Sequence, residues 1–125
     1  MDLSAFTGYK HVRKVWGEEI WLINSPLYCA KLLVLKPGMQ CSLHRHLVKT
    51  ETFFVLQGYP TIEVGTSGQK EGKVAGDSVH IPVGTWHRFG YVNGAPHPFQ
   101  TILLEVSSHH DDADVERLED SKPIG

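Results

Sequence analysis

The stretch GMQCSLHRHLVKTETFFVLQG, residues 38–58, places two histidines one residue apart and a glutamate five residues further on, between two glycines. Alternate side chains of a β-strand project from the same face, so we expect His44 and His46 to point the same way. By the same rule Glu51, Phe53 and Val55 share a face of the next run, after LVKT turns the chain. The stretch therefore predicts two adjacent strands that bring two imidazoles and one carboxylate together.

Short β-rich runs separated by turn residues extend on both sides of this stretch. The runs are YCAKLLVL, CSLHRH, ETFFVL, TIEVG, SVHIP, WHRFGYV and QTILLEV. Strands at this spacing are typical of an all-β sandwich or barrel. We expect one domain over residues 1–125, with a core of about 28–106, an N-terminal strand segment over 12–24 and an acidic C-terminal tail over 107–125. Within that tail, DDADVERLED is expected to form either a short helix or an irregular acidic segment.

The overall composition excludes several classes of partner. The formal net charge of −2 comes from 12 basic and 14 acidic residues scattered along the chain, so no basic stripe is available for nucleic acid or for a membrane surface. No apolar run has the length of a signal peptide or of a membrane span, and we expect a cytoplasmic protein. The two cysteines, Cys29 and Cys41, are too few for a disulfide framework and are expected to be buried thiols.

The histidine pair has the geometry of a metal-binding pincer. Imidazoles at positions i and i+2 of a strand can converge on one ion, and Glu51 adds an anionic oxygen from the next strand. Such a set suits Mn, Fe, Co, Ni or Zn rather than Ca or Mg. A further imidazole is available in GDSVHIPVGTWHRFGY, where His87 follows a Pro-Val-Gly turn and opens a strand.

These residues stand at the spacing of the two cupin motifs, and the sequence resembles the cupin superfamily. The first motif is matched in full by Gly38, His44, His46, Glu51 and Gly58, and the second by Gly76, Pro82, Gly84 and His87. Tyr91 replaces the asparagine that closes the second motif. The resemblance implies a double-stranded β-helix, or jelly-roll barrel, with one divalent transition metal held by His44, His46, Glu51 and His87.

Both flanks of the core resemble type II phosphomannose isomerases and related sugar isomerase cupins. The similar segments are KVWGEEIWLI, residues 14–23, and TILLEVSSHHDDADVERLEDS, residues 101–121. The resemblance implies an aldose–ketose isomerase for a sugar or sugar phosphate, in which the metal stabilises a cis-enediolate. Glu51 is then the candidate base if only one of its oxygens binds the metal, and Tyr91 or Lys31 is the candidate proton relay.

Other residues have both a functional and an ordinary interpretation. For Lys31 a surface lysine at a strand edge is the preferred interpretation. Glu18 and Glu19 are either a solvated acidic turn or sugar-hydroxyl acceptors. The tryptophans are expected in the core or an interface rather than as sugar-stacking surfaces. Among the remaining histidines, His80 is expected to face solvent, and His11, His97, His109 and His110 are expected to be solvated. Arg45 and Arg88 are expected to point away from the ligand face, which leaves no secure cationic pocket and favours an unphosphorylated sugar.

Two other functions remain open at this point. A cupin with this ligand set is either a non-catalytic protein that binds a sugar or another small molecule, or an iron-dependent dioxygenase. We also expect a homodimer, with VWGEEIWLI as the candidate strand for its interface.

Overall fold

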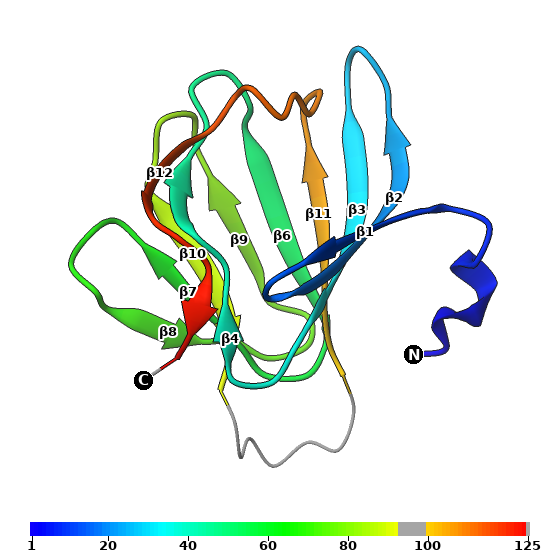
Figure 1. The fold of residues 1–125 in the computed structure, drawn as a ribbon, viewed down its shortest axis with the longest axis horizontal. Coiled ribbons are helices and arrows are strands. Elements are labelled where there is room, and N and C mark those ends of the chain that lie inside the picture. The colour runs from blue at the N-terminus through cyan, green and yellow to red at the C-terminus, as the bar shows by residue number, and fades with distance from the viewer. Residues whose placement is uncertain (93–99, 125) are drawn as a thin grey trace.

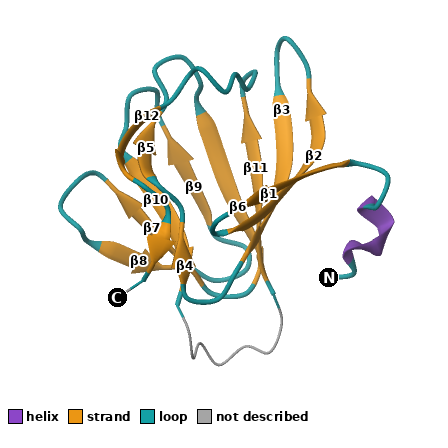
Figure 2. Ribbon diagram, viewed as in Figure 1, coloured by secondary structure: helices purple, strands orange, loops and turns teal. Residues whose placement is uncertain are grey.

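Two antiparallel β-sheets face each other in the computed structural model, which describes residues 1–92 and 100–124 (Figures 1 and 2). The first sheet has the order β1 (Lys10–Lys14), β2 (Gly17–Asn24), β3 (Cys29–Leu35), β11 (Thr101–Ser107), β6 (Glu51–Gln57) and β9 (Ser78–Ile81). The second has the order β12 (Glu116–Glu119), β5 (Leu43–Arg45), β10 (His87–Tyr91), β4 (Met39–Gln40) and β13 (Lys122–Pro123). In that sheet β7 (Pro60–Val64) pairs with β10 and with β8 (Lys70–Gly72). The prediction of an all-β fold is confirmed.

The main hydrophobic core lies between the two sheets. It is built from alternate residues of strands in both: Leu33, Leu35, Phe53, Val55, Ile62, Phe89, Tyr91 and Leu103, together with Trp16, Cys41 and Ile81. Strand β3 is buried on its other face as well, where Leu32 and Val34 form a second cluster with Ile20 and Ile102. Leu3 and Phe6 of the short 3₁₀ helix η1 (Leu3–Phe6) pack against this second cluster. Among the described residues, no helix is long and apolar enough to cross a membrane.

The inner face of the first sheet changes from apolar to charged toward one end. Along β3 the inward positions run from Leu35 and Leu33 to Lys31, and the register pairs Lys31 with Glu105 of β11. The same register places Glu105 opposite Phe53 of β6, two residues from Glu51. All three charged side chains are buried. Because buried charges are unfavourable unless they are paired or bind a ligand, this end of the core is the place to look for a functional site.

The glycine that closes the first motif is required by the turn from β6 to β7. Gly58 has a φ of 88°, and a Cβ atom there would lie 2.1 Å from Oγ1 of Thr101. A residue with a side chain would therefore meet both backbone strain and a steric overlap.

The predicted N-terminal strand is present, and the C-terminal segment differs in part from the sequence prediction. The N-terminal segment forms a hairpin in which β2 pairs with both β1 and β3, and its role in a dimer stays a prediction. The prediction of a short helix or irregular segment for residues 111–120 is wrong for residues 116–119, which form β12. After β11 the chain crosses to the second sheet (Figure 1), where β12 pairs with β5 and β13 with β4. The buried Arg88 guanidinium anchors this return through Glu119 and the carbonyl of Asp120.

Candidate metal centre

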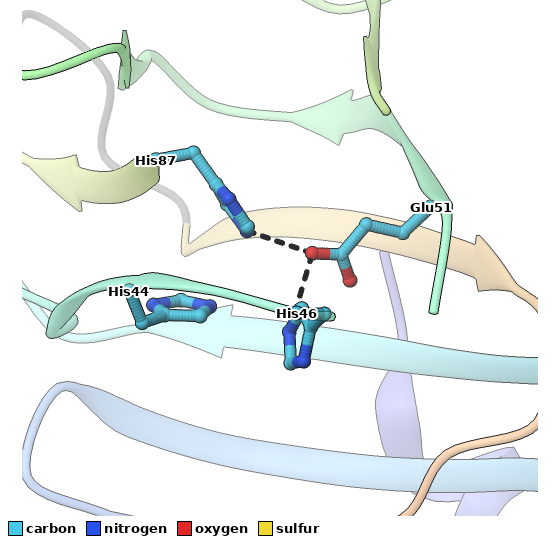
Figure 3. A group of neighbouring side chains, drawn as sticks. All are labelled: His44, His46, Glu51 and His87. Carbon is cyan, nitrogen blue, oxygen red and sulfur yellow. Dashed lines mark ion pairs between the residues drawn. The ribbon is translucent and has the colours of Figure 1, made fainter. Parts of the chain in front are cut away.

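The four predicted metal ligands meet at the charged end of the core (Figure 3). His44 lies on β5, His46 just after it, and Glu51 and His87 are the first residues of β6 and β10. Their ligand atoms all lie within 4.8 Å of one another, and Oε1 of Glu51 is 2.7 Å from Nε2 of His87 and 3.5 Å from Nε2 of His46. The group could hold a metal ion.

Backbone carbonyls fix the same tautomer in all three rings. Nδ1 of His44 donates to the carbonyl of Ser42 at 2.7 Å, Nδ1 of His46 to that of Asp114 at 2.5 Å, and Nδ1 of His87 to that of Thr85 at 2.9 Å. A carbonyl only accepts hydrogen bonds, so Nδ1 carries the proton in each ring and Nε2 keeps its lone pair. Orientation of metal-binding histidines by a second layer of acceptors is the usual arrangement in metal sites.

The electrostatics of the group also suit a cation. Burial lowers the pKa of His44 to about 3, and burial likewise lowers the pKa of His46, so both rings are neutral at neutral pH. Glu51 Oε1 and His87 Nε2 are buried atoms that lack a hydrogen-bond partner among the described residues. Both offer lone pairs to the same point, and two acceptors cannot satisfy each other. A divalent cation would satisfy them, so the donor set fits the metal that the sequence predicts.

A lysine that the sequence analysis missed binds the other oxygen of Glu51. Nζ of Lys49 lies 3.3 Å from Oε2 of Glu51, 3.1 Å from Oε2 of Glu105 and 3.1 Å from Nδ1 of His110. Burial opposes the charged form of Lys49, but the carboxylates of Glu105 and Glu51 outweigh it and raise the lysine pKa. The available signal was the position of Lys49 two residues before Glu51, inside the motif.

The contact between Lys49 and Glu51 affects whether Glu51 can act as the predicted catalytic base. Burial favours the protonated form of Glu51, but the adjoining His87 and the charge of Lys49 outweigh it and hold the pKa of Glu51 well below its usual value. A carboxylate with one oxygen toward the ligand group and the other bound to an ammonium is a weak proton acceptor. The catalytic role predicted for Glu51 is untested, and this placement argues against it.

Lys31 is not a surface lysine, because only 1% of it is exposed. Its Nζ lies 3.7 Å from Oε1 of Glu19 and 4.1 Å from the ring centre of Trp21, whose indole N–H donates to the same glutamate oxygen. Glu18 points to the other side of β2 and pairs with His11. Lys31 and Glu19 therefore face the interior together, which is compatible with the predicted relay role of Lys31.

Tyr91 lies elsewhere. It is buried in the main core cluster with Trp16 and Phe89 and is not part of the cavity lining. Its predicted role as a proton relay is untested, and this position gives it no support.

A cavity of about 130 Å³ opens beside the ligand group. Its lining includes His44, His46, Glu51, Lys49, Lys31, Glu19, Glu105, His110, Asp112, Lys14 and Arg117, and it is more polar than apolar. Two sequence predictions are wrong here: His110 is part of the cavity rather than solvated, and cationic side chains do line it. Arg45 and Arg88 point away, as expected, toward Glu116 and Glu119. His97 lies outside the described residues.

The segment after β11 holds the ligand loop in place. The Asp114 carboxylate accepts hydrogen bonds from the backbone N–H groups of Leu47, Val48 and Lys49 at 2.8, 3.0 and 2.9 Å, and its carbonyl accepts the bond from His46. Residues distant in sequence thus fix the turn between β5 and β6. The sequence analysis gave Asp114 no role, because an aspartate in an acidic run carries no signal of its partner.

Comparison with known proteins agrees with the cupin resemblance. The xanthan biosynthesis protein XanB of Xanthomonas campestris pv. campestris (strain B100) is 27% identical over 118 residues, which cover 94% of this chain and 24% of XanB. Other relatives of similar identity are named mannose-1-phosphate guanylyltransferase. The chain spans less than a quarter of the length of these curated relatives.

Two solved structures share the fold. KdgF from Halomonas sp. superposes with a TM-score of 0.69 at 17% identity, over 85% of this chain and 93% of KdgF. Oxalate decarboxylase from Bacillus subtilis gives a TM-score of 0.74 at 16% identity, over 90% of this chain and 31% of the decarboxylase. Both are cupins, and at these identities the likeness concerns the fold. The model of the family described as mannose-6-phosphate isomerase C-terminal matches residues 2–120, and the chain therefore belongs to that family.

Proposed function

We propose that this protein is a metal-dependent aldose–ketose isomerase for a small sugar that carries a phosphate. The observation that carries the proposal is the shared cavity, whose lining contains the ligand residues His44, His46 and Glu51 together with the ion pair of Lys31 and Glu19. A divalent transition metal held by His44, His46, Glu51 and His87 would polarise a carbonyl and a neighbouring hydroxyl. Isomerisation then requires a group that moves a proton between neighbouring carbons.

The residues opposite the ligand group have the chemistry for that step. Lys31 can donate a proton or a hydrogen bond to a sugar oxygen, and Glu19 can accept one. Trp21 packs against Lys31 and against the His110 ring, and so restricts the movement of both. Burial of Lys31 and Lys49 keeps water away from the reacting carbons, which strengthens each polar contact with the substrate.

Two cationic residues of the cavity lining support a phosphate-bearing substrate. Lys14 and Arg117 line the cavity, and within the described part of the chain neither forms an ion pair. Lys31 and Lys49, by contrast, are already paired with carboxylates. Two cations of the lining that form no ion pair suit a phosphate. The family description and the relatives' names refer to mannose phosphates, which agrees with this choice.

Proton exchange provides the test. The metal content of the purified protein is measured first, and proton exchange with deuterated water is then followed at C2 of aldoses and at C1 of ketoses, both free and phosphorylated. We expect exchange with the metal-loaded protein and none with His44→Ala, whereas His80→Ala, an exposed strand histidine, retains both metal and exchange. A metal-loaded protein that exchanges no proton of any sugar contradicts the isomerase.

A non-catalytic sugar-binding cupin is the second candidate function. It is favoured by the ion pairs of Lys31 and Lys49, because both ammonium groups are already bound by carboxylates of the protein. Binding of a sugar phosphate without exchange, measured by calorimetry, would support it. Oxygen consumption by protein loaded with ferrous iron under anaerobic conditions would point instead to the dioxygenase.

A further inference from the structure

The two carboxylate oxygens of Glu51 face different partners. Oε1 faces Nε2 of His87 and Nε2 of His46, at 2.7 and 3.5 Å, and has no hydrogen-bond donor among the described residues. Oε2 faces Nζ of Lys49 at 3.3 Å. Carboxylates bind metals through one oxygen or through both, so the partner of the second oxygen decides which mode is available.

The Lys49 ammonium has a full set of acceptors. It carries three N–H groups, and Glu51, Glu105 and His110 offer three acceptor atoms between 3.1 and 3.3 Å away. The acceptors come from β6, from β11 and from the segment after β11, while Asp114 holds the backbone of Lys49. Only 3% of Lys49 is exposed. An ammonium held from three sides in this way does not swing aside when the site is occupied.

We propose that Lys49 is a positioning residue that restricts Glu51 to binding the metal through one oxygen, and so keeps a coordination position open for substrate. The inference rests on the proposed metal centre but not on isomerase activity. To bind through both oxygens, Glu51 would have to give up a buried ion pair, which a low-dielectric interior makes unfavourable. A substrate that binds through a carbonyl and a hydroxyl needs two adjacent open positions.

Because Lys49 is positively charged, its effect on metal binding distinguishes this positioning role from a purely structural role. A cation beside a divalent ion repels it, so Lys49 opposes metal binding rather than favouring it. If Lys49 merely supported the fold of the site, its loss would weaken metal binding, by about 10-fold to 100-fold for a typical residue that contacts a ligand. If it restrains Glu51, its loss frees the second oxygen and leaves the metal bound as tightly or more tightly.

Manganese is a suitable probe because it prefers oxygen ligands and is paramagnetic. Kd for Mn²⁺ is measured by electron paramagnetic resonance, and water-proton relaxation gives the number of exchangeable waters on the bound ion. We expect Lys49→Met to keep or lower Kd, by roughly 10-fold at most, and to lose one exchangeable water. The matched control is Lys31→Met, which removes another buried lysine of the cavity that forms no ion pair with Glu51. It should keep the wild-type number of waters.

The outcomes separate the inference from the proposed function. An unchanged number of waters in Lys49→Met overturns the inference, as does a Kd raised 10-fold or more. Wild-type protein that binds no Mn²⁺ overturns both the inference and the metal centre, whereas a lost water in a protein without isomerase activity supports the inference alone. Should Lys49→Met fail to fold because Glu105 loses its partner, Lys49→Met combined with Glu105→Gln removes both charges and keeps the same expectation.

Discussion

Replacement of Asp114 by alanine tests how far the segment after β11 stabilises the metal-ligand loop. The carboxylate accepts hydrogen bonds from three consecutive N–H groups, those of Leu47, Val48 and Lys49. A hydrogen bond contributes roughly 0.5–1.5 kcal/mol net to stability. Leu47 and Val48 are exposed, so in the variant water can accept hydrogen bonds from their N–H groups. We therefore expect Asp114→Ala to lower the free energy of unfolding by about 1–3 kcal/mol.

The stability difference between wild type and Asp114→Ala should become smaller at acidic pH. Burial favours the protonated form of Asp114, but the three backbone N–H groups outweigh it and lower the pKa of its carboxyl below the ordinary 3.8. A group whose pKa is lowered by folding stabilises the protein above its unfolded pKa and loses that effect as the pH falls through its folded pKa. The difference between wild type and Asp114→Ala should therefore be constant from neutral pH to about pH 5 and shrink below about pH 4.

The assay is urea unfolding of metal-free protein, followed by tryptophan fluorescence. Asp112→Ala is the matched control, because the Asp112 side chain lies in the same segment, is 87% exposed and pairs with the His110 ring rather than with the backbone of the ligand loop. We expect it to cost less than about 0.5 kcal/mol. Equal costs for the two variants, or a difference that grows as the pH falls, would refute the assignment of the loop restraint to Asp114.

Three further predictions concern the scaffold and its assembly. Gly58→Ala should lower the free energy of unfolding, measured in urea, by more than about 1 kcal/mol. The loss should exceed that of Gly65→Ala, because both glycines have positive φ but only at Gly58 would a Cβ meet Thr101. Equal losses in the two variants would contradict this. Cys29 and Cys41 are buried, and burial raises the pKa of both thiols, that of Cys41 to about 12, so both should react with a thiol reagent only after unfolding. Size-exclusion chromatography should give about twice the 14.0 kDa chain mass if the predicted homodimer forms, and elution at the chain mass would exclude it.

The ligand group was predictable from sequence because its spacing is local. His44, His46 and Glu51 lie within eight residues, so strand alternation and one turn suffice to bring them together. The place of His87 needed the second motif, since it depends on the pairing of β10 with β5, which puts His87 directly opposite His44. The cupin resemblance supplied that pairing.

The contacts of Lys49 with Glu105 and His110 were not predictable, because those two residues are distant from Lys49 in the sequence. Lys49 meets Glu105 and His110 across 56 and 61 residues of chain, through the register of β11 with β6 and the path of the segment that follows. Nothing in the local pattern around His110 distinguishes it from a solvated histidine. Strand β12 gave no signal either, because all four of its residues are exposed and therefore show no alternation of apolar and polar side chains.

The charged residues that line the cavity form two groups, one close to the predicted metal ligands and one that consists of Lys14 and Arg117. The buried carboxylates of Glu51 and Glu105, together with Glu19, slightly outnumber the ammoniums of Lys31 and Lys49, so the interior has a small negative charge before a metal binds. A divalent ion held by the ligand residues would reverse that sign and would stabilise an oxygen that gains negative charge. Lys14 and Arg117 are exposed residues of the cavity lining that form no ion pair among the described residues, and they would add to the attraction for an anionic substrate. In the proposed isomerase, a bound metal would therefore favour binding of an anionic sugar, with the phosphate near Lys14 and Arg117 and the reacting carbons near the metal ligands.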